Sequence, residues 1–168
     1  MPAVPVDGLT FHFPSGWEAA KYDDWQFFTK TFQRISPGTK AIDLVAVSPP
    51  PEPCFWVVEV KNYNGPRSKP GSLVQDVAQK VRDGLAGLAA ARVMASVLRE
   101  HRLAGLALWS PKLRVVLHLE QPPASGLFRR AFDPAKVELG LQQLLLGVDP
   151  RARVVESADM RGVPWTVT

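Results

Sequence analysis

Two short apolar runs carry charged residues in their interiors, and this pattern strongly limits the folds open to the chain. The runs are Ala41–Val47 and Phe55–Lys61, and a Pro-rich segment joins them. The first run contains Asp43, while the second contains Glu59 and ends at Lys61. Charges half-buried on a strand are costly unless an opposite charge or a metal ion compensates them. The pattern therefore predicts two adjacent strands built around a compensated charge cluster.

The alternation of side chains along a strand shows which of these residues share a face. Asp43 shares a face with the valines two and four positions later, and Glu59 and Lys61 share a face with Val57. Neighbouring strands lie about 4.8 Å apart, so both carboxylates can reach one Mg²⁺ ion, which prefers oxygen ligands. The residues also fit a second interpretation, in which Asp43 forms a plain salt bridge with Lys61 or Lys40 and Glu59 is solvated.

An Asp, a hairpin and a Glu-x-Lys triplet in this order resemble the PD-(D/E)XK nuclease superfamily, which has the restriction-endonuclease-like fold. The matching residues are Asp43 and Glu59-Val60-Lys61, and Ile42 replaces the proline of the motif, which is not a ligand. The resemblance implies Asp43 and Glu59 as Mg²⁺ ligands, with Mn²⁺ as a substitute. It implies Lys61 as the residue that orients the attacking water or stabilises the transition state.

The implied activity is hydrolysis of phosphodiester bonds in DNA, as an endonuclease or an exonuclease, with RNA as the less favoured substrate. One alternative is a catalytically silent protein of the same fold that binds nucleic acid or a partner protein. Another is an α/β interaction protein unrelated to nucleases, in which the acidic residues are exposed and splayed apart.

Other members of that superfamily add a carboxylate from the first helix, and a Gln or Lys from the helix after the third strand. Glu18 is the first candidate for the added carboxylate, with Asp23 and Asp24 as alternatives. For the second role we favour Gln79 over Gln75, because Gln75 belongs to a helix-capping pattern. Lys80 takes that role if the helix is rotated.

Periodicity and turn signals predict an α/β fold with a mixed central sheet, in a single domain that spans residues 1–168. This αβββαβ order matches the core of the restriction-endonuclease-like fold. The first expected elements are an irregular or partly extended lead-in over 1–16, a helix over Trp17–Lys30, and strands over Thr31–Ile35, Lys40–Val47 and Phe55–Lys61. A helix over Ser72–His101, a strand over Leu113–Leu119, a helix from Asp133 to Gly147, and short strands over Arg153–Glu156 and Pro164–Val167 are expected to follow.

Charge is unevenly distributed along the chain. Residues 1–60 hold 4 basic and 7 acidic side chains, whereas residues 61–130 hold 12 basic and 4 acidic ones. An acidic segment followed by a basic one suits a site that holds a metal and attracts phosphate, although solvated Arg side chains on helices give the same counts. The expected DNA contacts are Arg67, Lys69, Arg129 and Arg130. At this size, specificity has to come from loops, from a homodimer or from a partner protein.

Other site classes receive no support from the sequence. The single cysteine, Cys54, excludes an internal disulfide framework and fits a reducing cytoplasm. No secretory signal and no membrane span is expected, so we predict a cytoplasmic protein without a membrane partner. There is no Gly-rich phosphate loop and no zinc-type cysteine spacing. The three histidines, His12, His101 and His118, have no ligand-like spacing.

Overall fold

The computed structural model describes residues 1–35, 37–64, 72–123 and 130–168, and within them a five-stranded mixed sheet forms the centre. Strands β3, β4 and β5 are antiparallel, and β6 and β7 continue the sheet in parallel with β5. The expected mixed α/β architecture is confirmed. In spatial order the strands are β3 (Glu18–Lys21), β4 (Leu44–Val47), β5 (Cys54–Asn62), β6 (Lys112–Glu120) and β7 (Arg153–Val155).

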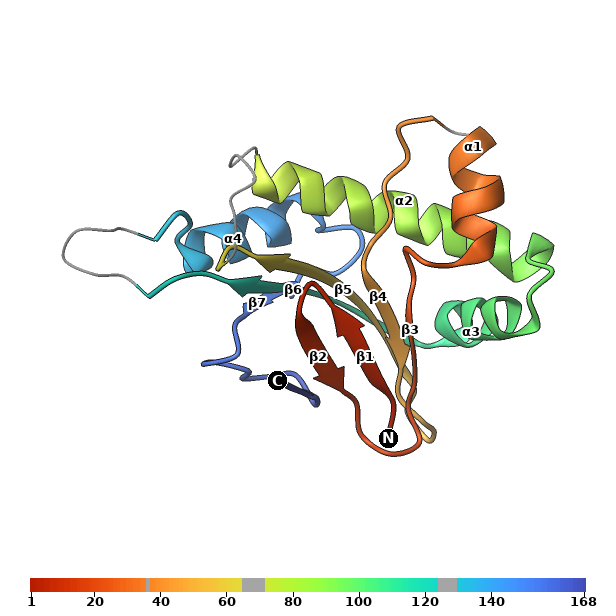
Figure 1. Ribbon diagram of the computed structural model, residues 1–168, viewed down its shortest axis with the longest axis horizontal. Helices are drawn as coiled ribbons and strands as arrows, with labels where there is room; N and C mark the ends of the chain where they lie inside the picture. Colours follow the sequence, from red (N-terminus) through yellow and green to blue (C-terminus); the bar gives the residue numbers. More distant parts are fainter. Residues whose placement is uncertain (36, 65–71, 124–129) are drawn as a thin grey trace.

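Helices cover one face of this sheet and a small second sheet covers the other (Figure 1). The helical layer is made of α2 (Leu73–Met94), α3 (Leu98–Trp109) and α4 (Pro134–Leu144). The small sheet has the order β1-β2-β8, with β1 at Ala3–Val6, β2 at Leu9–His12 and β8 at Thr166–Val167. Both faces of the central sheet are therefore buried in apolar cores.

Strand β5 divides its side chains between these two cores. Val57 packs in the core beneath the helices, while Val58 and Val60 pack in the core beneath the small sheet. The alternation places Glu59 on the helix-covered face. In the antiparallel register Leu44 pairs with Val58, so Asp43, directly before β4, lies beside Glu59. The strand pairing thus brings the two carboxylates together, as the sequence pattern predicts.

Helix α2 packs closely on the sheet because small and apolar side chains recur along one side. A Cβ atom at Gly84 would lie 3.0 Å from Ile42 Cδ1, so glycine permits this close approach. Ser72 occupies the N-cap position but makes no side-chain cap hydrogen bond, so the side-chain bond of the capping pattern expected around Gln75 is absent. The buried residues that define this side of the helix are Leu73, Val77, Ala78, Val81, Gly84, Gly87, Leu88 and Ala91.

The single long helix predicted over Ser72–His101 is divided into α2 and α3. Ala95 and Val97 have extended backbone angles, which end one helix and precede the next. In the first turn of α3 the buried Glu100 accepts hydrogen bonds from the backbone N–H groups of Gln26 and Phe27, at 2.6 and 3.0 Å. The break lets α3 turn back and support this distant segment.

The helix predicted over Trp17–Lys30 is wrong in its first part, where a strand forms, and the strand predicted over Thr31–Ile35 is wrong. Residues Glu18–Lys21 form β3, and helical turns follow at Phe28–Phe32 (η1) and Gln33–Ile35 (α1). Pairing with β4 supplies the hydrogen bonds of β3, and this tertiary contact overrides the helix preference of its alanines. A compact group of aromatic rings, made of Tyr22, Trp25, Phe27, Phe28 and Phe32, fixes the turns that follow.

The lead-in, expected to be irregular or partly extended, forms the β1–β2 hairpin. Val4 and Val6 on β1 are buried, as are Phe11 and Phe13 on the other side of the turn, with the alternation of a half-buried strand. Asp7 and Gly8 make the turn with positive φ angles of 49° and 81°. This period-two pattern is present in the sequence, but the prolines obscure it.

The later elements follow the prediction closely. Strand β6 extends the expected Leu113–Leu119 by one residue at each end. Asp133 caps α4 by accepting a hydrogen bond from Ala135 N at 3.1 Å, although the helix ends before Gly147. Across the described residues, no helix is both long and apolar enough to cross a membrane.

Candidate functional site

Asp43 and Glu59 face α2 from adjacent strands and approach one positive charge. The ammonium of Lys80, on α2, lies 2.6 Å from Glu59 Oε1 and 3.9 Å from Asp43 Oδ1. Asp43 Oδ2 accepts a 2.7 Å hydrogen bond from the backbone N–H of Val60. We call Asp43 and Glu59 the acid pair. Its two carboxylates converge on a single cation, which excludes the arrangement in which they are splayed apart.

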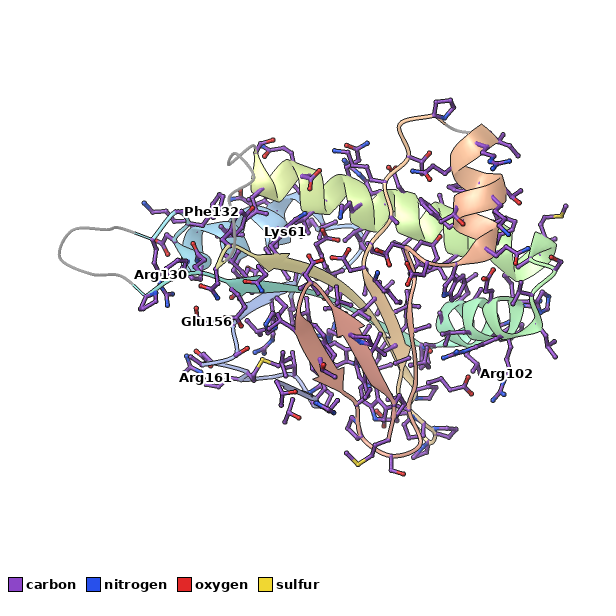
Figure 2. The ribbon with its side chains drawn as sticks, in the orientation of Figure 1. Lys61, Arg102, Arg130, Phe132, Glu156 and Arg161 are labelled. Carbon is purple, nitrogen blue, oxygen red and sulfur yellow. The ribbon has the colours of Figure 1, made fainter. Side chains whose placement is uncertain are left out.

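Further lysines and an aspartate extend the acid pair into a network of alternating charge. Lys61 Nζ lies 3.0 Å from Glu59 Oε1 and 3.6 Å from Asp76 Oδ2. Lys40 Nζ donates a 2.7 Å hydrogen bond to Asp76 Oδ1. Figure 2 shows Lys61 near the end of β5, beneath α2. We call the set Lys40, Asp43, Glu59, Lys61, Asp76 and Lys80 the acid–lysine cluster.

The pKa of Glu59 is strongly raised by its surroundings in this cluster. Its side chain is fully buried, and Oε2 has no hydrogen-bond partner in the described part of the chain. Burial and then the neighbouring Asp43 carboxylate raise the pKa of Glu59 to about 8, against the lowering effect of Lys80 and Lys61. The charged form of Glu59 is therefore disfavoured in the metal-free site, and a bound cation would favour it.

Lys61 remains protonated at neutral pH. Burial lowers the pKa of its ammonium, but the Glu59 and Asp76 carboxylates raise it by more, and the result is about 12. A lysine with this pKa cannot act as a general base near pH 7. It can supply a fixed positive charge to a negatively charged substrate group.

The residues present fit a hard divalent cation with few protein ligands. Among the described residues no group of three or more His, Cys, Asp or Glu side chains could hold a metal ion. Mg²⁺ is commonly bound through one or two carboxylates together with waters and substrate phosphates, so the acid pair is a sufficient donor set. The unpaired Oε2 of Glu59 is an oxygen that such an ion would satisfy.

Of the carboxylates considered for the added acidic role, Asp23 is the one that interacts electrostatically with Asp43 of the acid pair. Burial and then Asp43 act to raise the pKa of Asp23, and Oδ1 is buried without a hydrogen-bond partner in the residues described. Glu18, the first candidate, instead forms an ion pair with Arg102 and pairs with Val47 at the far end of β4. Figure 2 shows Arg102 far from Lys61.

On α2, Lys80 occupies the place for which Gln79 was favoured. Gln79 Nε2 donates a 3.4 Å hydrogen bond to Asp83 Oδ2, whereas Lys80 contacts both members of the acid pair. The helical pattern contained the signal for this, because Lys80 lies three residues after Val77 and four before Gly84, on the side that faces the sheet.

The expected nucleic-acid contacts are largely untested by the structure. Arg67, Lys69 and Arg129 lie outside the described residues. Arg130 forms an ion pair with Glu156 at 3.1 Å, and Figure 2 shows the two close together. A phosphate at Arg130 would therefore have to compete with an existing carboxylate partner.

Comparison with known proteins assigns no family to the chain. No family model and no solved structure matches it. A cysteine–tRNA ligase from Neisseria meningitidis serogroup A is 25% identical over 212 aligned residues. The alignment covers 100% of this chain but 30% of the ligase, so the chain spans less than a third of that relative's length. This is a similarity to one part of a longer protein.

Proposed function

We propose that the protein is a Mg²⁺-dependent nuclease that hydrolyses phosphodiester bonds in DNA. The observation that carries this proposal is the convergence of Asp43 and Glu59, from adjacent strands, on one cation. The unpaired and fully buried Oε2 of Glu59 supports it, because burial and the Asp43 carboxylate disfavour the charged form of Glu59 in the metal-free protein, and a bound cation would stabilise that form.

Each residue of the site has a distinct role in this proposal. Asp43 and Glu59 would hold the Mg²⁺ ion, which would supply counter-charge to the phosphate and would lower the pKa of a bound water. Lys61 lies on the same face of β5 as Glu59 and carries a permanent charge at neutral pH. It would stabilise the additional negative charge that develops on the phosphate oxygens in the transition state.

The order of the elements around the acid pair supports a restriction-endonuclease-like fold. Antiparallel β3, β4 and β5 are followed by α2 and α3, and then by β6 parallel to β5. This is the strand and helix order that the PD-(D/E)XK superfamily would require after its first helix. The first helix is the departure, because helical turns lie between β3 and β4 instead.

The second candidate function is nucleic-acid or protein binding by a catalytically silent member of the same fold. The contact that favours it is the 2.6 Å ion pair between Lys80 and Glu59, which compensates the site internally. In that case the acid–lysine cluster stabilises the fold and holds no metal. The two candidates differ in whether a divalent cation binds.

A cleavage assay with Mg²⁺ or Mn²⁺ on single-stranded, duplex and branched DNA tests the proposal. We add tRNA to these substrates because the similar ligase has tRNA in its name. Glu59→Gln should abolish cleavage, while Glu52→Gln, a matched change at an exposed residue, should leave it intact. DNA binding without cleavage by the wild type under all conditions would favour the silent alternative.

A further inference from the structure

We propose that Lys80 is a resident counter-cation, which holds the acid pair in the metal-free protein and leaves it when a divalent cation binds. This inference rests on the proposed function, because it assigns the acid pair to a metal. It adds a step in which metal binding displaces an internal ammonium group. The charge of Lys80 then lowers the affinity of the acid pair for the divalent cation.

Lys80 lies against both carboxylates that the acid pair offers to a metal ion. Asp43 Oδ2 is committed to the backbone N–H of Val60, so Oδ1 is the oxygen that it offers to a cation. The Lys80 ammonium lies 3.9 Å from that oxygen and 2.6 Å from Glu59 Oε1. A divalent ion held between Asp43 Oδ1 and the Glu59 carboxylate, whether through Oε1 or the unpaired Oε2, would be repelled by the neighbouring ammonium. The ammonium and the ion therefore compete for the same pair of carboxylates.

The helix that carries Lys80 is held against the sheet, so the displacement has to be a movement of the side chain. Gly84, one turn after Lys80, packs on Ile42, and a Cβ atom there would lie 3.0 Å from Ile42 Cδ1. Ile42 directly precedes Asp43 in the chain. The distance between α2 and the acid pair is therefore fixed by packing, while the Lys80 side chain has a flexible four-carbon stem.

A second carboxylate is within reach of the displaced ammonium. Asp76 lies one turn before Lys80 on the same side of α2, which is the spacing at which helical side chains meet. Lys80 already acts electrostatically on Asp76. The ammonium can therefore move along the helix from Glu59 towards Asp76 without leaving the acid–lysine cluster.

Mn²⁺ binding to Lys80→Met and to Arg82→Met, measured by titration calorimetry, tests the competition. Methionine keeps an unbranched stem and removes the charge, and Arg82 is an exposed residue of the same helix, so both variants lose one positive charge. Lys80→Met should lower the Kd for Mn²⁺ by at least about tenfold relative to Arg82→Met, because a competing charge-assisted hydrogen bond is lost. An equal or higher Kd would overturn the inference.

The wild-type protein provides a second measurement that does not depend on a variant folding. An amine-acylating reagent, followed by mass spectrometry, should modify Lys80 several-fold faster with Mn²⁺ than without it, while the exposed Lys136 should react equally in both. Unchanged or slower acylation of Lys80 would overturn the inference while leaving metal binding intact. Absence of Mn²⁺ binding in the wild type and in Lys80→Met would instead reject the proposed function and this inference together.

Discussion

The backbone N–H of Val60 donates a 2.7 Å hydrogen bond to Oδ2 of Asp43. This bond crosses from β5 to the residue just before β4, and it turns the other carboxylate oxygen towards α2. The side chain of Val60 lies in the opposite core and takes no part. The first carboxylate of the acid pair is therefore positioned by the backbone, whereas Glu59 is positioned by lysine side chains.

Two replacements of Asp43 should distinguish the effect of its hydrogen bond with Val60 from the effect of its negative charge on stability. Both Asp43→Asn and Asp43→Ala remove one negative charge and relieve repulsion of Glu59, but only asparagine retains an oxygen that can accept from Val60. Asp43→Ala should therefore be less stable than Asp43→Asn by about 1–3 kcal/mol, the cost of a buried unpaired donor. Urea denaturation of the two metal-free variants measures this difference. Equal stabilities would show that the Val60 bond contributes nothing.

The metal-free protein should lose stability as the pH rises from about 4.5 to about 8. The pKa of Glu59 is raised from 4.5 to about 8 in the folded state, so in this window the folded state holds a proton that the unfolded state has released. Stability falls with pH wherever the folded state binds more protons. Thermal unfolding across this range should show the decline in the wild type, and Glu59→Gln should flatten it. An identical pH profile for both proteins would contradict the raised pKa.

Lys61→Met should slow cleavage more than it weakens metal binding. Under the proposed function Lys61 stabilises the transition state, and loss of one such group commonly costs about 10²–10³-fold in kcat. Lys40→Met is the matched control, because Lys40 contacts Asp76 in the same cluster but not Glu59. Comparison of kcat with the Kd for Mn²⁺ in both variants checks the assignment. A similar loss of rate in both would indicate a general effect of charge.

Gly84→Ala should destabilise the protein and disturb the site. The added methyl group would lie 3.0 Å from two carbons of Ile42, and overpacking of this kind costs about 1–3 kcal/mol. Gly105→Ala in α3 is the control, because its nearest neighbour is the flexible Arg92 side chain. That change should be neutral or stabilising, by up to about 1 kcal/mol, since alanine favours a helix. Thermal unfolding compares the two, and equal melting temperatures would disprove the close packing.

The acid pair could be predicted from the sequence because strand alternation is a strong local constraint. Asp43 and Glu59 lie within apolar runs, and the period of two along each strand is enough to place both carboxylates on one face of the sheet. Lys80 could have been preferred over Gln79 by the same logic, since the apolar positions of α2 define its inward side.

Strand β3 could not be predicted in this way. Strand β3 reads Glu-Ala-Ala-Lys, which favours a helix locally, and only its pairing with β4 makes it a strand. That pairing is a contact between distant segments, which no local pattern contains. The proximity of Asp23 to the acid pair depends on the same pairing, because Tyr22 N donates to Asp43 O at 2.8 Å.

Because the side chains of β5 pack in two different cores, they also favour one register of β5 against β4. A slip of one residue against β4 would turn Glu59 and Lys61 towards the core beneath the small sheet, and would turn Val58 and Val60 towards α2. The misaligned chain would bury a carboxylate away from Lys80 and lose its ion pairs. Glu59 would thus also specify the alignment of β5 with β4, because only the correct register places its carboxylate beside Lys80.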